Sequence, residues 1–522
     1  MALKVIIIGA GLAGSLLANG LIRNDLEVEV YERDIEDSKR EGYQIRLGAM
    51  SLRGFHTCLN TDLCQDIISR FGKTNGQIYT TPVLYNIDLE PLRGFGKTQP
   101  YSKSAPINRV VLRDALVEPL KKARVVHFEK KYVECEIISG KGGRDKIRAH
   151  FNDGTSAEGD IMIAADGSGS KINREVGLDN ILERKERCGF IAKCQLPVSK
   201  LRQLPRQLRA GPIVIEENGI SFIASAYLPE KKRNKLSSRP KTYKQQDFVQ
   251  LHDPRDYWKQ SISSESSVRS TSRRSISSDE TDISYDEAAA SLMWNMNVPR
   301  EKLPEDMDID DPIEFVIDII SHWSPTIHDI IRSTPEEEFY RFYGRVGMCP
   351  ESNWRDTGRF GKFIDPRKGH PRIWFIGDSI HPMLPTRAMG GNQAMCDAGE
   401  VCDALTNLAQ TDHPTNAQIL SAVSAYEATM IPRAFEWVEK SNNAGGKYVK
   451  MTSKILGGFK NRASSSRSSS KGPTSYRLDN WKGKTHLFWA RRTAEIDANL
   501  GVVLRRVGFK KDLSEREFDV GK

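Results

Sequence analysis

The order of apolar and polar residues over positions 4 to 31 predicts a strand, a helix and a second strand. Residues 4 to 8 form a short apolar run, and residues 11 to 22 place apolar side chains at helical spacing. Residues 26 to 31 then alternate between apolar and polar side chains, which is typical of a strand. These residues are therefore expected to form a β-α-β unit.

The same patterns predict further strands and helices. Residues 186 to 228 are strand-like, and within them 213–216 and 220–227 flank Asn218-Gly219, a dipeptide that favours the tight turn of a hairpin. The remaining strands are expected at 132–138, 146–151, 160–165, 291–298, 339–346 and 372–376, and the helices at 107–123, 391–408 and 416–441. At 522 residues, the chain is expected to form two packed domains or one large α/β unit with extra segments.

Two tracts rich in Ser and Arg interrupt these patterns. Residues 229 to 285 contain few apolar residues and are expected to form an exposed insertion, and a second tract covers 462 to 472. The excess of basic residues, 77 against 68 acidic ones, is concentrated in such peripheral regions. Residues 231–275 and 441–522 carry net charges of +8 and +11, which leaves the rest of the chain at −10. A solvated, mostly disordered role and a specific anionic partner are the two interpretations, and nucleic acid is not the expected partner.

Several classes of protein are disfavoured by what the sequence lacks. It contains no run of about 18 apolar residues, so we expect no transmembrane helix. The apolar run at 5 to 8 is too short for a signal peptide, which favours a cytoplasmic protein. The eight cysteines include no C-x-x-C pair and no histidine at metal-ligand spacing, so we expect buried free thiols and no metal site.

A glycine-rich turn follows the first predicted strand. Gly9, Gly11 and Gly14 form a G-x-G-x-x-G motif, and Glu32 ends the second strand 18 residues after the last glycine. The first glycine permits a tight turn, the second lets the backbone approach a pyrophosphate, and the third allows close packing of helix on strand. The N-terminus of the helix would face the phosphates, and Glu32 could accept hydrogen bonds from the adenosine ribose. The unit predicts binding of a dinucleotide, which on this motif alone could be NAD, NADP or FAD.

Two later motifs narrow the choice, because Asp166-Gly167 and Gly377-Asp378 each follow a predicted strand. Together with the glycine turn, they resemble the single-component flavin-dependent aromatic hydroxylases of the p-hydroxybenzoate and salicylate hydroxylase type. The resemblance covers roughly residues 3 to 228 and 287 to 445. It implies an α/β fold in which a Rossmann-like FAD-binding domain of the glutathione reductase type carries an interwoven β-sheet substrate domain of the p-hydroxybenzoate hydroxylase type and C-terminal helices.

On this basis the chain divides into four regions. The FAD-binding domain takes residues 1–180 and, with its helices, 346–445. The substrate domain takes 181–345, interrupted at about 230–285, and a partly disordered basic extension takes 446–522.

The resemblance assigns FAD-binding roles residue by residue. Asp378 would bind the ribityl chain, with Gly377, His381 and Pro385 belonging to the same motif. Gly390, Gly391 and Asn392 match a glycine-rich turn that opens a helix toward the N1 and O2 side of the flavin, where the helix dipole would stabilise anionic reduced flavin. The sequence departs from the family here, because Ala388 replaces the first glycine.

Further residues are assigned in the same way. Asp166 and Gly167, followed by Ser170 and Arg174, resemble a motif that serves both the FAD pyrophosphate and the nicotinamide cofactor. Arg109 falls where the family places an arginine that approaches the FAD phosphates, whereas Arg113 on the same helix is expected to be structural or solvated. Arg46 could line the flavin pocket or be an ordinary exposed arginine.

The family's chemistry supplies the expected reaction. NADPH or NADH reduces FAD, reduced flavin captures O₂ as a C4a-hydroperoxide, and an electron-rich aromatic ring takes the distal oxygen. The substrate is expected to be a small phenolic or polyketide-like aromatic molecule, and the motifs and insertions look like those of fungal secondary metabolism. His381 and Arg387 are the two catalytic candidates, although His381 could serve packing and Arg387 could pair within its own loop.

Other readings of the same residues stay open. A dehydrogenase or reductase of the same fold would share the FAD site, and epoxidation or Baeyer-Villiger oxygen insertion would use the same chemistry as hydroxylation. From a different class, the chain could be a non-catalytic FAD-bound interaction protein whose Ser/Arg tracts contact a partner.

Overall fold

The computed structural model describes residues 3–36, 38, 43–73, 80–92, 104–231, 285–304, 309–335, 338–359 and 365–442. All of them belong to one compact unit, Met1–Leu456. A second unit, Gly457–Lys522, lies outside the described residues. The predicted basic extension at 446–522 also lies outside them, as does the predicted insertion at about 230–285 except for residues 230, 231 and 285.

A five-stranded parallel sheet contains the two strands of the predicted β-α-β unit. Every residue of β1 after Lys4 is buried, as expected for a parallel strand that is covered on both faces. Because all the pairings are parallel, the carboxyl ends of strands from distant parts of the sequence meet at one edge. The strand order is β16 (Ile373–Phe375), β10 (Ile161–Ala164), β1 (Lys4–Ile8), β2 (Glu27–Tyr31) and β6 (Val126–His127).

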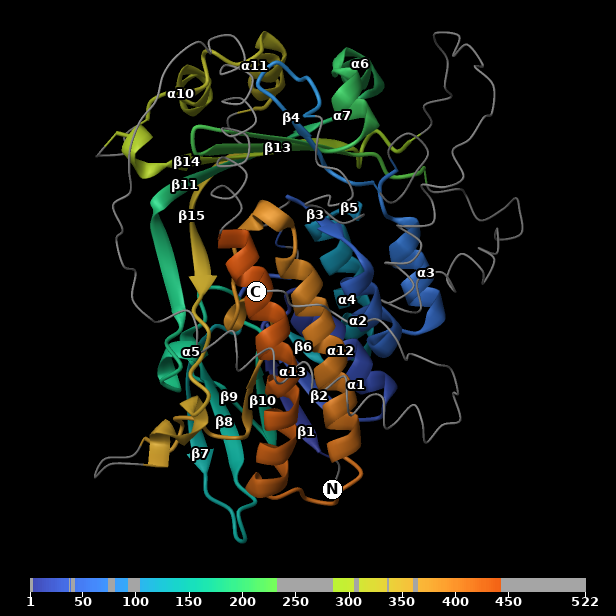
Figure 1. Cartoon of the computed structure of the whole chain (residues 1–522). Coiled ribbons are helices and arrows are strands. Elements are labelled where there is room, and N and C mark those ends of the chain that lie inside the picture. Colours follow the sequence, from blue (N-terminus) through green and yellow to red (C-terminus); the bar gives the residue numbers. More distant parts are fainter. Residues whose placement is uncertain are drawn as a thin grey trace, which may run out of the picture. The chain divides into compact units, whose positions relative to one another are not determined.

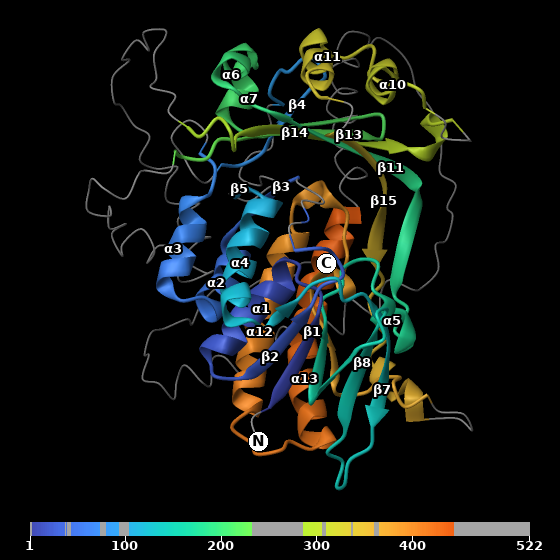
Figure 2. The ribbon, with the colours of Figure 1, turned by 180° about the vertical axis from the view of Figure 1, so that it is seen from behind.

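Two layers cover this sheet. Figures 1 and 2 show helices on one side and a three-stranded antiparallel sheet on the other. The helices are α1 (Leu12–Arg23), α2 (Ala49–Cys58), α3 (Thr61–Ser69), α4 (Arg109–Ala123), α12 (Gly390–Leu408) and α13 (Asn416–Asn442), and the strands are β7 (Tyr132–Ile138), β8 (Lys146–Phe151) and β9 (Ser156–Gly159). The helices pack tightly, since a Cβ atom on Gly54 of α2 would lie 2.0 Å from the carbonyl oxygen of Met395 in α12.

A second, six-stranded sheet lies across the ends of α12 and α13 in both views (Figures 1 and 2). One of its faces forms a separate apolar core with four helices, in which Phe222 and Trp294 are fully buried. The strand order is β15 (Phe339–Gly347), β11 (Ile181–Gln195), β14 (Ser291–Pro299), β13 (Ile220–Tyr227), β12 (Ile213–Glu217) and β4 (Val83–Tyr85), and the helices are α6 (Val198–Gln203), α7 (Arg206–Ala210), α10 (Pro312–Ile319) and α11 (Pro325–Arg332).

The other face of the six-stranded sheet contacts a small ribbon made of β3 (Gln44–Leu47) and β5 (Ala105–Asn108). The side-chain amide of Gln44 donates to both oxygens of Ser291, at 3.0 and 3.1 Å. The short elements that complete the fold are α5 (Lys171–Glu175) and the 3₁₀ turns η1 (Arg300–Lys302), η3 (Trp354–Arg359), η4 (Gly377–Ser379) and η5 (Pro385–Arg387).

The structure confirms the predicted mixed α/β class with a parallel sheet, and most predicted elements are present. The predicted hairpin is β12 and β13, and both Asn218 (φ 48°) and Gly219 (φ 82°) adopt left-handed backbone at its turn. The helix predicted from residue 107 was wrong at its start, because Ile107 and Asn108 pair with β3 and the helix begins at Arg109. The strand pattern predicted over 186–228 is also interrupted by α6 and α7.

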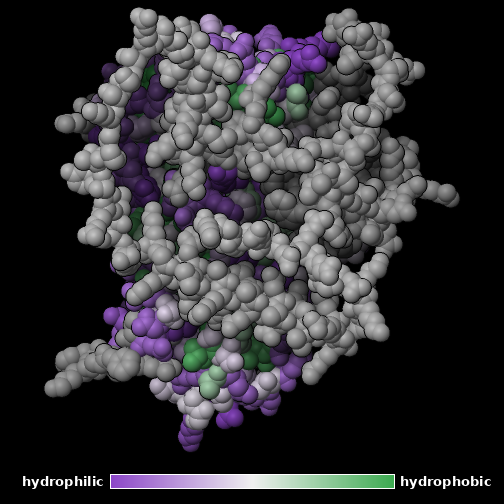
Figure 3. All heavy atoms as spheres, in the orientation of Figure 1, coloured by the Kyte–Doolittle hydropathy of each residue, from purple (hydrophilic) through white to green (hydrophobic). Residues whose placement is uncertain are grey.

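The cysteines were expected to be buried free thiols. All eight are free, and seven of them are buried. Cys349 is exposed, so the prediction was wrong for this residue. Within the described residues, no helix is long and apolar enough to cross a bilayer. The described surface visible in Figure 3 is mostly hydrophilic.

Candidate active site

The glycine turn after β1 leaves little room for side chains. Gly9 has a φ of 110°, and a Cβ atom there would lie 2.5 Å from the carbonyl oxygen of Ala165. A Cβ atom on Gly14 would lie 2.1 Å from the carbonyl oxygen of Gly9. Gly11, the N-cap of α1, is different, since a Cβ atom there would meet nothing within 4 Å. The turn therefore has no room for a side chain at Gly9 or Gly14, but has free space in front of Gly11.

Glu32, at the end of β2, holds this turn in place. Its Oε2 atom accepts a hydrogen bond from the backbone N–H of Ala10 at 2.8 Å, and Oε1 accepts one from the N–H of Asp34 at 3.0 Å. Each carboxylate oxygen has a second lone pair, which leaves acceptor capacity for a ligand hydroxyl. Glu32 thus fixes the turn and lines the space in front of it.

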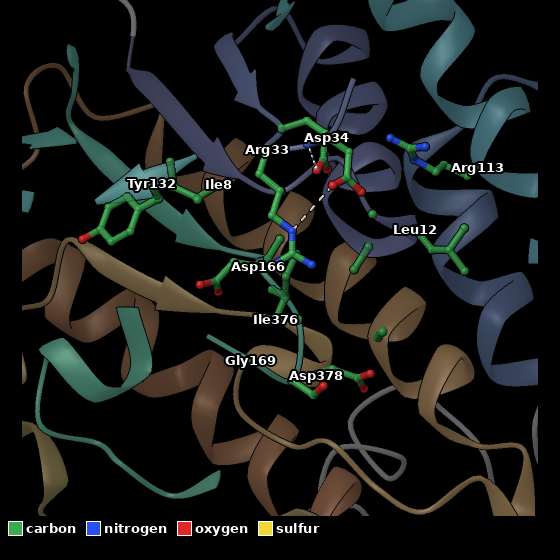
Figure 4. Close-up of a pocket in the computed structure, with 18 of the residues that line it drawn as sticks. Ile8, Leu12, Arg33, Asp34, Arg113, Tyr132, Asp166, Gly169, Ile376 and Asp378 are labelled. Atoms are coloured by element: carbon green, nitrogen blue, oxygen red, sulfur yellow. Dashed lines mark hydrogen bonds and ion pairs between the residues drawn. The ribbon is translucent and has the colours of Figure 1, made fainter. Parts of the chain in front are cut away.

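A cavity of about 560 Å³ opens at the carboxyl edge of the parallel sheet (Figure 4). Separate parts of the sequence line it, namely residues between 8 and 45, the segment from 109 to 174, Arg345 of β15, and the segment from 376 to 394. The predicted site residues that line this cavity are Gly9, Gly11, Glu32, Arg109, Asp166, Gly167, Asp378, Gly390 and Gly391.

Arginine and lysine side chains make one side of the cavity basic. Arg109, the first residue of α4, lines it and lies over the ring of Tyr43, 5.7 Å from the ring centroid. Arg113, one turn further along α4, also lines it and donates to the carbonyl oxygens of Ala10 and Ser38 at 3.4 and 3.0 Å. Arg33, Lys130, Lys131, Lys171, Arg174 and Arg345 add further positive charge.

The Asp166-Gly167 turn follows β10. The Oδ2 atom of Asp166 accepts a hydrogen bond from the N–H of Lys171 at 3.0 Å, and Gly167 has a φ of 78°. The Oδ1 atom of Asp166 is buried and has no hydrogen-bond partner among the described residues. Burial raises the pKa of this carboxyl group. In Figure 4 Asp166 and Asp378 both border the pocket, with Arg33 extending between Asp34 and Asp166.

The Gly377-Asp378 turn follows β16 and forms η4. Gly377 has a φ of 61° and is buried, and its N–H donates to Oδ2 of Asp397 at 2.8 Å. Asp378 is exposed to the cavity. The helix α12 then begins at Gly390, and Gly390 and Gly391 line the cavity, so the N-terminus of α12 with its partial positive charge borders it.

Other predicted site residues lie outside the cavity lining. Gly14 lies behind the turn, and Pro385 opens η5. Asn392 is buried, where Oδ1 accepts from the N–H of Gly48 at 2.7 Å and Nδ2 donates to the carbonyl oxygen of Arg46 at 2.9 Å. Arg387 lies in η5, and its Nε atom is buried.

Arg46 was predicted to line the flavin pocket or to be exposed, but it is buried elsewhere. Its guanidinium does not line the cavity but points toward the six-stranded sheet, where it donates to oxygens of Thr80, Ser104 and Ser225. Burial lowers its pKa to about 9. The alternation of β3 explains the difference, because Ile45 faces the cavity and Arg46, the next residue, faces the opposite way.

His381 is also removed from the cavity, because it is fully buried beside Asp397. Arg433 of α13 donates to Oδ1 of Asp397 at 2.8 Å and to Glu400 at 2.8 Å. Burial alone would raise the pKa of Asp397, but His381 and Arg433 together hold it below its ordinary value. Sequence reasoning missed this network, although Asp397 stands between the apolar residues 394–396 and Ala398, which was a visible signal.

Comparison with known proteins places these features in context. The dual O-methyltransferase/FAD-dependent monooxygenase elcB of Phaeosphaeria nodorum is 21% identical over 462 residues, covering 84% of this chain and 45% of that protein. The FAD-dependent monooxygenase thnD of Trichoderma harzianum is 23% identical over 450 residues, covering 84% of this chain and 92% of that protein. This chain is related to fungal FAD-dependent monooxygenases. It spans less than half the length of the elcB protein.

A solved structure shares the fold. Klebsiella pneumoniae HpxO, crystallised with FAD and uric acid, matches with a TM-score of 0.56 and 17% identity over 88% of this chain and 93% of that one. No family model matches the chain. The relatives confirm the predicted resemblance, and the enzyme class and FAD dependence that their names give agree with those predicted for this chain. No group of three or more metal-ligating side chains occurs within the described ranges.

Proposed function

We propose that this protein is a FAD-dependent, NAD(P)H-consuming monooxygenase that inserts one atom of O₂ into an aromatic, phenolic or polyketide-like substrate. One observation carries the proposal. A single cavity brings together the glycine turn, the Asp166-Gly167 turn, Asp378 and the start of α12, in a chain related to FAD-dependent monooxygenases. Each of these features ends a strand of the parallel sheet or begins a helix, where ligands of such sheets bind.

The residues present fit FAD. The open position at Gly11 and the N-terminus of α1 would hold the pyrophosphate, with Arg109 supplying positive charge. Glu32 would accept from the adenosine ribose, and Asp378 from the ribityl chain. The unpaired Oδ1 atom of Asp166 lacks a donor that a bound cofactor or its ordered water would provide. Bound FAD would supply the transfer of electrons from NAD(P)H to O₂.

The start of α12 would lie against the flavin ring. Gly390 and Gly391 leave space there, since the nearest atoms to a Cβ on either residue are 3.7 Å or more away. The partial positive charge at the helix N-terminus would stabilise negative charge on the ring system. Ala388 takes a left-handed conformation, φ 54°, at the position where the family has glycine, so the loop keeps this backbone shape with an alanine in it.

Within this proposal, the parallel sheet and its covering layers form a Rossmann-like FAD-binding domain of the glutathione reductase type. The six-stranded sheet, whose strands come from residues 83–85 and 181–347, forms the substrate domain of the p-hydroxybenzoate hydroxylase type. Its own residues would bind the substrate, orient the ring and exclude water from the reacting atoms. HpxO, which binds uric acid, is an example of a related fold that accepts a planar ring.

The test separates oxygenation from the other reactions open to this fold. The FAD-loaded full chain is reduced with NADPH, and separately with NADH, without oxygen, and is then mixed with isotopically labelled O₂ and 2,6-dihydroxyanthraquinone as a probe. We expect one labelled oxygen in the product for each NAD(P)H consumed. Release of all the oxygen as H₂O₂ or water with no labelled product would contradict a monooxygenase. The Asp378→Ala variant is the control for the cofactor site, and it should lose FAD while remaining folded, because its side chain is exposed.

A further inference from the structure

One face of the six-stranded sheet, here called the polar face, carries a set of polar side chains. The strand register places Glu216, Ser221 and Asn297 side by side on neighbouring strands, and Asn295 lies two residues further along β14. The intervening residues, such as Phe222 and Met296, belong to the apolar core on the other face. Because side chains alternate along a strand, the polar set points away from that core.

This polar face contacts the ribbon β3–β5. The N–H of Gln44 contacts the sulfur of Met293 at 3.1 Å, and the guanidinium of Arg46 lies 3.4 Å from Oγ of Ser225. Met293 lies two residues from Asn295, and Ser225 lies four residues from Ser221, so these side chains point to the same face of the sheet. The polar set therefore lies on the face that the ribbon β3–β5 contacts.

Two polar atoms on this face lack partners. Asn295 and Asn297 are only 6% and 7% exposed, and Nδ2 of Asn297 donates to Oδ1 of Asn295 at 2.7 Å. Nδ2 of Asn295 and Oε2 of Glu216 are both buried and have no hydrogen-bond partner among the described residues. Leaving such a buried atom unpaired destabilises the protein. One unpaired donor and one unpaired acceptor on the same face indicate a ligand that supplies the opposite groups.

The loop before α12 meets this face. A Cβ atom on Gly344 of β15 would lie 2.4 Å from Cδ2 of Leu384, so the loop that includes η5 presses against the sheet. Burial raises the pKa of Glu216 to about 7, while the positive charges of Arg387 in η5 and Arg187 in β11 act to lower it. Glu216 thus lies near the loop whose continuation, Gly390 and Gly391, lines the candidate FAD cavity.

We propose that Glu216 and Asn295 bind the substrate, and that Glu216 accepts the proton of a substrate hydroxyl while Asn295 donates to a substrate carbonyl. This inference rests on the proposed function and names its substrate class. Asn295 lies two strands away from Glu216 across the sheet and two residues away along the strand. In a regular sheet this offset separates their Cα atoms by about 12 Å. That separation favours a hydroxylated ketone or quinone of two or three fused rings over a single ring.

The proton transfer balances without another reactant. The proton leaves the hydroxyl oxygen for Oε2 of Glu216, which gives a neutral carboxylic acid and a phenolate. A phenolate ring is richer in electrons and reacts more readily with an electrophilic oxygen. The positive charge of Arg387 would favour the phenolate in this position.

The test measures binding, so that it does not depend on turnover. FAD-loaded full chain is titrated with 2,6-dihydroxyanthraquinone, whose visible absorption changes when a hydroxyl is deprotonated, and with 9,10-anthraquinone, which has the carbonyls but no hydroxyl. We expect wild type to bind the hydroxylated probe as its phenolate. Glu216→Gln should weaken this binding at least tenfold and abolish the phenolate band, and leave binding of 9,10-anthraquinone unchanged. Asn295→Ala should weaken binding of both probes.

Glu217→Gln is the matched control. Glu217 is the next residue of the same strand, points to the other face, and accepts a hydrogen bond from Nε1 of Trp323 at 3.0 Å, which glutamine can also accept. It should bind both probes as wild type does. Wild-type affinity and an unchanged phenolate band in Glu216→Gln would overturn the role of Glu216, and failure of wild type to bind the hydroxylated probe would overturn the substrate class. Failure of the proposed function is seen separately, as loss of labelled oxygen in a product while FAD and probe still bind.

Discussion

The Nε2 atom of His381 lies 2.6 Å from Oδ2 of Asp397, and neither side chain has exposed surface. The same Oδ2 atom accepts the N–H of Gly377, and Oδ1 accepts from Arg433. Asp397 on α12 thus ties the Gly377-Asp378 turn to helix α13. His381 was predicted as a catalytic candidate, and its position instead suits a residue that holds the turn carrying Asp378.

Replacing Asp397 with alanine should destabilise the protein strongly. The substitution leaves Arg433 without its buried partner and removes the acceptor of the Gly377 N–H, and breaking a buried ion pair in this way typically costs about 3–5 kcal/mol. Urea unfolding of the FAD-free protein would measure the loss. Glu400→Gln is the control, because glutamine keeps an oxygen that can accept from Arg433 and Asp397 remains as the charged partner, so this change should cost clearly less. Equal losses in the two variants would contradict the assigned role of Asp397.

Two glycines of the N-terminal turn should respond differently to alanine. A methyl group on Gly14 would overlap the carbonyl oxygen of Gly9, so Gly14→Ala should lower the free energy of unfolding by about 3 kcal/mol or more. A methyl group on Gly11 meets no protein atom, so Gly11→Ala should fold with a change of about 1 kcal/mol or less. It should nevertheless lose at least tenfold in FAD affinity, because the methyl group projects where the pyrophosphate is proposed to lie. Thermal unfolding without FAD and titration with FAD check the two effects, and unchanged affinity in Gly11→Ala would argue against this placement of the cofactor.

Glu216 should make the free protein less stable as the pH rises. Its pKa in the folded state is raised from 4.5 to about 7, so the folded protein binds more protons than the unfolded chain between these values. Stability therefore falls as the pH rises through this window, by up to about 3 kcal/mol. Glu216→Gln removes this term and should be more stable than wild type at pH 8 but not at pH 4. Unfolding free energies at the two pH values would show it, and parallel pH profiles for the two proteins would refute it.

The segment between residues 231 and 285 should be replaceable by a short turn. The strands on either side, β13 and β14, are antiparallel neighbours, and the N–H of Asp286 donates to the carbonyl oxygen of Pro229 at 2.8 Å. The two ends of the segment are thus already adjacent. Joining them with a Gly/Ser turn should preserve FAD affinity and change the midpoint of thermal unfolding little. A large loss of FAD affinity would show that the segment contributes to the cofactor site.

Much of the backbone around the candidate FAD site could be predicted from sequence, because local chemistry determines it. A tight glycine turn after an apolar strand needs the same backbone wherever it occurs, and Gly9 has the positive φ that this turn requires. The acidic residue at the end of β2 and the apolar strands β10 and β16 were visible for similar reasons. Helices α10 and α11 were not predicted, since their packing on the second sheet depends on contacts with residues far away in the sequence.

The polar face of the second sheet could be predicted only in part from the sequence. The order Trp294, Asn295, Met296, Asn297 alternates apolar and polar residues and was visible in the sequence. It indicated a strand with two different faces, but only the register with β12 and β13 shows that Glu216 shares a face with the asparagines. The position of Arg46 also depends on the register of its strand. Ile45 faces the cavity, and Arg46, the next residue of β3, faces the second sheet.

The cavity is lined by residues 8 to 45, by residues 109 to 174, by Arg345, and finally by residues 376 to 394. A ribosome makes these parts in that order, so the glycine turn exists long before the strand and helix that complete its surroundings. The last residue that lines the cavity is Ala394, so a nascent chain must reach this residue before it contains the whole candidate site. Under the proposed function, FAD can therefore meet its complete site only after β16 and the start of α12 have been synthesised.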